Sequence, residues 1–182
     1  AQKQVFNDAN NAYKTAGLSA NEYMNTVTSF SASLISSLNG DTEAAARAAN
    51  QAIVDMSDNA NKMGTDMSLI QSAYQGFAKQ NYTMLDNLKL GYGGTKTEME
   101  RLLKDAEKIS GVKYDISNLN DVYSAIHVIQ TEMGITGTTA AEAEKTISGS
   151  ANAMKGAFEN LITGFGNADA DMQVLVKNLA DS

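Results

Sequence analysis

The chain has 182 residues and a formal net charge of −7, with no cysteine, no proline, no tryptophan and a single histidine. The lack of cysteine excludes disulfides, thiol nucleophiles and zinc–thiolate or iron–sulfur sites, and one histidine excludes any site that needs two imidazoles. The acidic balance argues against nonspecific nucleic-acid binding, which depends on Lys and Arg, and no stretch approaches the ~20 apolar residues of a membrane span.

Helical periodicity dominates the N-terminal half of the chain. From residue 23 to residue 38, large apolar residues recur every three or four positions, which places them on one face of an α-helix. Ser19 and Glu22 form a capping-box pattern just before this run, and Asn39 and Gly40 supply a left-handed end. The apolar face consists of Tyr23, Val27, Phe30, Leu34 and Leu38.

Two more helices are predicted before residue 80. One lies between Asp41 and Gly64 and has the apolar positions Ala45, Ala49, Ile53, Met56, Ala60 and Met63. The other follows Thr65 and carries Met67, Ile70, Tyr74 and Phe77. A short segment with Leu85 and Leu88 then continues to about residue 90.

A glycine cluster, Gly91-Tyr92-Gly93-Gly94, interrupts the helical pattern. A phosphate-binding loop would need Gly-Lys-Ser/Thr after a strand, but here Thr95 separates Gly94 from Lys96 and the preceding segment is helical in pattern. We therefore interpret the cluster as a flexible helix–helix joint. Residues 1–182 are expected to form a single helical segment of a longer protein, with a subdivision into 1–90 and 95–182 at this joint as the alternative.

Three further elements are predicted after the joint. Thr95 and Glu98 form a second capping-box pattern, followed by an apolar helical run that ends at Gly111. Residues 112–116 alternate apolar and polar, but a lone strand has no partner, so we interpret them as an extended loop. A second helical run, with apolar residues spaced three and four positions apart, ends at Gly134 and Gly137. The two runs carry Met99, Leu102, Leu103, Ala106, Ile109 and then Leu119, Val122, Ile126, Ile129, Met133.

In the C-terminal region, a final helix is predicted after a third capping-box pattern, which consists of Thr139 and Glu142. Its apolar positions are Ile147, Ala151, Met154, Phe158, Leu161 and Phe165, and a further apolar pattern follows at Met172, Leu175, Val176 and Leu179. This helix and the one before it share a heptad-like seam, which fits antiparallel packing in a bundle better than a coiled coil. The predicted fold is all-α: a bundle of about seven to nine helices with glycine-rich joints and, as an option, an extended C-terminal helix.

No candidate site for chemistry meets its geometric requirements. His127 with nearby Ser124 lacks an orienting partner, and we interpret His127 as a boundary residue with a local hydrogen bond. Asn167, Asp169 and Asp171 resemble a calcium loop, but loop positions six and twelve hold Met172 and Asn178 instead of Gly and Glu. We therefore predict no catalytic, cofactor-binding or metal-binding residues and no enzymatic activity.

Several side chains are expected to be structural. Glu98 with Arg101, and Glu100 with Lys104, have the spacing of ion pairs on a helix surface. Gly149 and Gly156 stand seven apart and would either let a neighbouring helix approach or merely loosen their own helix. The nine methionines fit core filling better than an adaptable binding surface.

One stretch is more specific than these patterns. Residues 78–99, AKQNYTMLDNLKLGYGGTKTEM, resemble a signature of tail tape measure proteins of long-tailed phages and prophages of Gram-positive bacteria. Four other segments agree with the same family in colinear order, and the resemblance covers the chain from about residue 6 to 180. They are residues 30–34 (FSASL), 55–64 (DMSDNANKMG), 126–130 (IHVIQ) and 134–140 (GITGTTA).

The resemblance implies a structural role in the virion. A tape measure protein is a long, mostly helical chain in the lumen of the tail tube, and its length sets the length of the tail. The implied partners are tail tube, tail tip and tail assembly proteins, with possible self-association through helices, and assembly takes place in the bacterial cytoplasm. The alternative is a secreted or surface helical protein-interaction module, for which the acidic, helical, cysteine-free composition is the support.

Overall fold

The computed structural model describes residues 1–145 and 155–160. In these ranges it is all-helical, as predicted, with seven α-helices, one 3-10 helix and a helical turn at residues 155–160. The elements are α1 (Gln2–Thr15), α2 (Ala20–Ser37), α3 (Thr42–Met63), α4 (Met67–Phe77), η1 (Leu85–Leu88), α5 (Lys96–Ser110), α6 (Leu119–Glu132) and α7 (Thr138–Lys145). None of the helices in this described part is long and apolar enough to cross a membrane.

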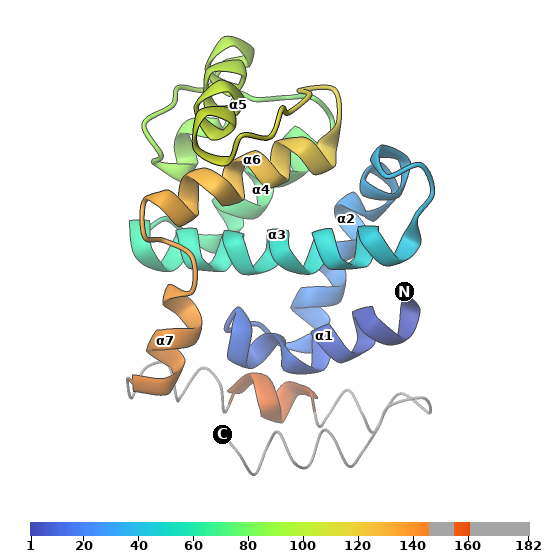
Figure 1. The fold of residues 1–182 in the computed structure, drawn as a ribbon. Helices are drawn as coiled ribbons and strands as arrows, with labels where there is room; N and C mark the ends of the chain where they lie inside the picture. The colour runs from blue at the N-terminus through green and yellow to red at the C-terminus, as the bar shows by residue number, and fades with distance from the viewer. Residues whose placement is uncertain (146–154, 161–182) are drawn as a thin grey trace.

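Helix α3 is the centre of the bundle. It lies across the middle of the molecule and packs against α1, α2, α4, α6 and α7, while α5 packs on α6 at one end (Figure 1). The packing is possible because α3 presents alanines on its buried faces, which lets neighbouring helices approach closely. It also buries four polar residues among the apolar ones: Asp55, Ser57, Asp58 and Asn59.

A cluster of aromatic rings fills the core between α2, α4 and α6. The Phe30 and Tyr123 rings meet edge to face with centroids 5.6 Å apart, and the Tyr74 and Tyr123 centroids are 4.9 Å apart. The Tyr123 hydroxyl donates a 2.8 Å hydrogen bond to the Tyr74 carbonyl, so its polar end is satisfied. One continuous apolar core runs from α1 to α6, and the division at residues 91–94 stays a prediction.

The first capping box is confirmed and the second is formed only in part. At α2, the Ser19 side chain accepts from the Glu22 amide, and the Glu22 carboxylate accepts from the Ser19 amide. At α5, Thr95 accepts from the Glu98 amide, but the Glu98 carboxylate accepts from the Gly93 amide at 3.0 Å. The Glu98 carboxylate therefore binds the glycine loop at Gly93, whereas a complete capping box would have it accept from the amide of the N-cap residue Thr95.

The third capping box is wrong. Thr139 lies inside α7, and the amides at the start of this helix donate to Asp58 of α3. The Gly137 amide is 2.6 Å from one Asp58 oxygen, and the Thr139 amide is 2.8 Å from the other. A carboxylate from another helix thus caps the start of α7, in place of the local Thr139–Glu142 pair that the sequence spacing predicts.

The glycine loop joins η1 to α5, as predicted, and contacts with neighbouring residues hold it, while its flexibility stays a prediction. The Arg101 guanidinium donates to the Gly91 carbonyl at 2.8 Å and lies over the Tyr92 ring, 4.3 Å from its centroid. A Cβ at Gly94 would overlap the Thr83 carbonyl group, so only glycine fits there. The loop is therefore built on a close approach of two backbones.

Other local predictions have mixed outcomes. Residues 112–116 form an extended loop without a strand, and Glu98 pairs with Arg101 at 2.7 Å, both as predicted. Within the described part, Glu100 lies 4.0 Å from Lys96 instead of pairing with Lys104. A Cβ at Gly156 would lie 2.7 Å from the Tyr13 Cβ, so this glycine allows close packing on α1, while Gly149 lies outside the described residues.

Candidate functional site

The most unusual polar feature is a carboxylate–imidazole pair between α3 and α6. Asp55 of α3 is 1% exposed, and its two oxygens lie 2.8 and 3.1 Å from Nδ1 of His127 on α6. The Gln51 side-chain amide donates to the same carboxylate at 3.2 Å. Because an ionised carboxylate only accepts hydrogen bonds, His127 donates from Nδ1.

The two groups perturb each other's protonation. Burial raises the pKa of Asp55, and the hydrogen bonds from His127 and Gln51 offset part of that effect. The hydrogen bond to Asp55 raises the pKa of His127, against an opposing effect of partial burial. The His127 side chain is 33% exposed, so the pair has one sealed member and one that reaches solvent.

A second set of hydrogen bonds holds the same interface behind the pair. The Gln130 side chain on α6 donates to the Asp55 carbonyl at 3.0 Å. Asn59 of α3 donates to Gln130 at 2.8 Å and to the Leu88 carbonyl at 2.9 Å. Gln130 and Asn59 are both fully buried, so these bonds fix the register of α3, α6 and η1.

A cavity of about 500 Å³ opens beside His127 and Asp55. Polar residues on its wall include Arg47, Gln51, Asn120 and Ser124. The imidazole could exchange a proton there, but nucleophilic catalysis also needs a hydroxyl within hydrogen-bond reach of the base. Among the described residues, Ser124 makes no hydrogen bond with His127, and no three His, Asp or Glu side chains come together as metal ligands.

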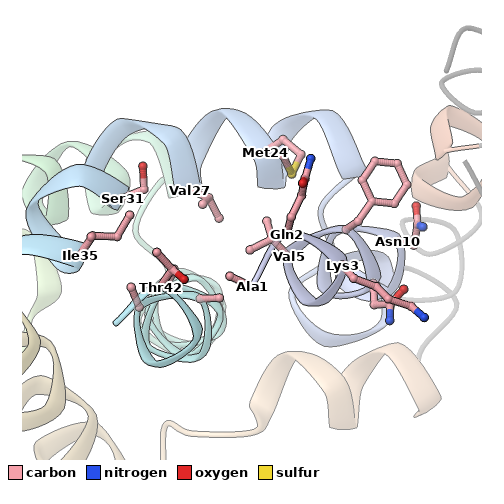
Figure 2. Close-up of a pocket in the computed structure, with 15 residues that line it drawn as sticks. Ala1, Gln2, Lys3, Val5, Asn10, Met24, Val27, Ser31, Ile35 and Thr42 are labelled. Atoms are coloured by element: carbon pink, nitrogen blue, oxygen red, sulfur yellow. The ribbon is translucent and has the colours of Figure 1, made fainter. Parts of the chain in front are cut away.

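A larger groove, of about 820 Å³, lies between α1, α2 and the start of α3. Figure 2 shows Val5 of α1 and Met24, Val27 and Ile35 of α2 around this space, with Thr42 at the α3 end. Polar groups stand among them, including Gln2, Lys3, Asn10 and Ser31. The lining of the groove is therefore mixed, with apolar side chains in the majority and several polar groups among them.

The structure partly corrects the interpretation of His127. It is a boundary residue, as expected, but its hydrogen-bond partner is Asp55, 72 positions away, instead of a local group. Sequence reasoning did not single out Asp55, Asp58 or Gln130 as site residues. The available signal was weak: Gln51 and Asp55 share one face of their helix, and His127 and Gln130 share one face of theirs. The rejected calcium loop at Asn167, Asp169 and Asp171 lies outside the described residues.

The fold and this site define an all-helical protein in which a buried aspartate pairs with a partly exposed histidine at the interface of two helices. No family model, curated protein or solved structure matches the chain.

Proposed function

We propose that the chain is a segment of a phage tail tape measure protein, a structural component of the virion that occupies the tail tube and sets tail length. The observation that carries this proposal is the resemblance of residues 78–99 to the family signature. The four other segments that resemble the family, in the same order along the chain, support it. The proposal assigns no catalytic residue, cofactor or metal.

The positions of the signature residues support a structural role. Gly94 is at a point where only glycine fits against Thr83, and the Glu98 carboxylate holds the Gly93 amide. The Tyr82 hydroxyl donates to the Ile116 carbonyl at 3.2 Å, which ties the signature to the loop before α6. These contacts shape the backbone of the signature segment, which fits the proposed assembly role.

The folded form bears on how the segment would act in a tail. Its longest described helix, α3, has 22 residues and spans about 33 Å. As one continuous helix, 182 residues would span about 270 Å. The segment would therefore have to unfold to act as a ruler along its whole length, whereas the bundle suits a folded assembly module. Tail tube, tip and assembly proteins are the proposed partners in both cases, and the tube lumen is the proposed location.

An in-frame deletion of these residues in the phage that encodes them tests the proposal. Electron microscopy of the particles would measure tail length. A ruler segment predicts tails shortened by up to about 270 Å, from the helical rise per residue. A folded assembly module predicts that tails are lost or misassembled. Fully infectious particles with tails of unchanged length would overturn both forms of the proposal.

The groove between α1 and α2 favours a second candidate, a secreted or surface helical protein-interaction module. Such modules commonly bind a helix or peptide of a partner in a groove that has apolar side chains. Mass spectrometry separates the two candidates. The tail proposal predicts the chain in purified virions in a fixed ratio to tail tube protein. The alternative predicts the chain in the culture supernatant or on the cell surface of strains that form no particles.

A further inference from the structure

The Asp55–His127 contact is a titratable bond in the middle of a helix–helix interface. Asp55 is sealed from solvent, while His127 borders the cavity of about 500 Å³ and can exchange protons with water. We propose that Asp55 and His127 form a pH-sensitive latch that holds α6 on α3 more tightly at mildly acidic than at alkaline pH. This inference stands apart from the proposed tail function, since it depends only on the α3–α6 geometry.

The latch follows from the cost of a buried charge. With His127 protonated, the Asp55 carboxylate has an ionic hydrogen bond 2.8 Å long. With a neutral ring, the same carboxylate stays buried with only neutral donors, and a buried charge without a counter-charge is costly. The Gln130 and Asn59 hydrogen bonds do not titrate, so the interface is expected to loosen at alkaline pH and not to come apart.

Several other ionisable groups lie around the pair. Asp58 of α3 acts on both members, Arg47 of α3 lines the cavity, and burial raises the pKa of Tyr74 on α4 and of Tyr123 on α6. Tyr114 of the preceding loop also lines the cavity. In α2 the charged residue is Glu22, in its first turn, and Glu100, Lys104 and Glu107 of α5 line a different cavity with Asp121. Other charged residues on elements that pack against α3 include Lys3, Asp8 and Lys14 on α1, Asp86 in η1 and Glu142 on α7.

The direction of the pH effect is set by the raised pKa of His127. Folding raises the pKa of His127 above its ordinary 6.5, so its stabilising contribution is complete below 6.5 and is lost as the pH rises through the folded value. Burial raises the pKa of Asp55, and protonation of Asp55 at lower pH would remove the charge with which His127 pairs, so the ionic contact exists only between the pKa of Asp55 and that of His127. The tightest α3–α6 contact is therefore expected at mildly acidic pH, where Asp55 is a carboxylate and His127 is protonated.

The single histidine makes the first test unambiguous, because every imidazole resonance of the 182-residue chain belongs to His127. NMR titration of the ring should give a midpoint above 6.5 in the unmodified chain. Asp55→Asn should move the midpoint down. Glu132→Gln removes a carboxylate from the exposed end of the same helix and should leave the midpoint in place. A midpoint at or below 6.5 in the unmodified chain would overturn the latch.

Hydrogen exchange of the α6 amides tests the mechanical consequence. After correction for the intrinsic pH dependence of exchange, α6 should open at least about threefold more often at pH 8.5 than at pH 5.5. His127→Gln keeps a neutral donor for Asp55 but cannot titrate, so its ratio should be close to one. An equal pH dependence in both proteins would refute the proposal, and this comparison decides the matter even where Asp55→Asn does not fold.

Discussion

At the scale of single residues, Gly94 is the position with the least freedom to change. A side chain there would overlap the Thr83 carbonyl, and neither backbone segment can give way without disturbing the turn before α5. We expect Gly94→Ala to lower the free energy of unfolding by about 2 kcal/mol or more, the cost of overpacking a close contact. Chemical denaturation would measure it.

Gly93→Ala is the matched control. A Cβ at Gly93 would meet the Glu98 side chain at an ordinary 3.5 Å, and alanine keeps the amide that Glu98 accepts from. The stability should change by less than about 1 kcal/mol in either direction. Equal losses in the two variants would mean that the loop resists any substitution and that the Thr83 contact is not the cause.

Glu98 offers a residue-scale prediction on pH. Hydrogen bonds from Arg101 and from the Gly93 amide lower the pKa of Glu98 to about 2. Since the folded pKa is below the ordinary 4.5, the contribution of this carboxylate is present above 4.5 and is lost as the pH falls toward 2. Carboxyl ¹³C shifts should show Arg101→Gln raising the midpoint, with Lys104→Gln leaving it unchanged. A midpoint near 4.5 in the unmodified chain would contradict the ion pair.

At the scale of helices, the sequence predicts well where large apolar residues and caps coincide. Helices α2, α3, α5 and α6 were all predicted close to their observed ends because periodicity and a capping or glycine signal agree there. Helix α1 was missed, since its buried positions are chiefly the small Ala9 and Ala12 with Tyr13, in a polar, asparagine-rich stretch. Alanines differ little in hydrophobicity from their polar neighbours, so they produce only a weak helical pattern in the sequence. Helix α1 is instead stabilised by its packing against α2 and α3.

The candidate site could not be predicted for a related reason. Asp55 and His127 come together only because α3 and α6 cross, and no local spacing encodes a pair 72 positions apart. The Asp58 cap of α7 is of the same kind, since it joins groups 79 and 81 positions apart. From their residue types alone, the polar residues in the middle of α3 would be predicted to be exposed. They are buried because neighbouring helices surround α3.

The attachment of α7 yields the element-scale prediction. Asp58 is fully buried and accepts from two amides, whereas an asparagine has one acceptor oxygen and would turn its amide donors toward the other N–H. Asp58→Asn should therefore cost about 2 kcal/mol, the loss of a charged hydrogen bond in a buried site. Urea denaturation measures the cost, and faster hydrogen exchange in α7 locates it.

Asp41→Asn is the control for that change. Asp41 is the exposed N-cap of α3, and asparagine caps a helix about as well as aspartate, so the stability should hardly change. If Asp58→Asn were as harmless as Asp41→Asn, the carboxylate of Asp58 would not be what holds the start of α7 on α3.

At the scale of the whole molecule, the apolar core determines whether the chain is compact or extended. The apolar core is continuous across α1 to α6, and its contacts join residues from both sides of the glycine loop. Extending the chain into one continuous helix would expose these buried apolar faces to water, which is unfavourable. The purified 182-residue chain should therefore be compact.

Small-angle scattering with light-scattering mass tests this expectation. A compact chain of 182 residues should have a radius of gyration of about 16 Å. A continuous helical rod about 270 Å long would give roughly 80 Å, from the same helical rise. A value near 16 Å at monomer mass would mean that any ruler role requires the bundle to be unfolded during tail assembly. An elongated multimer would instead mean that apolar faces are buried between chains, so that the helix contacts described here would have to form in trans.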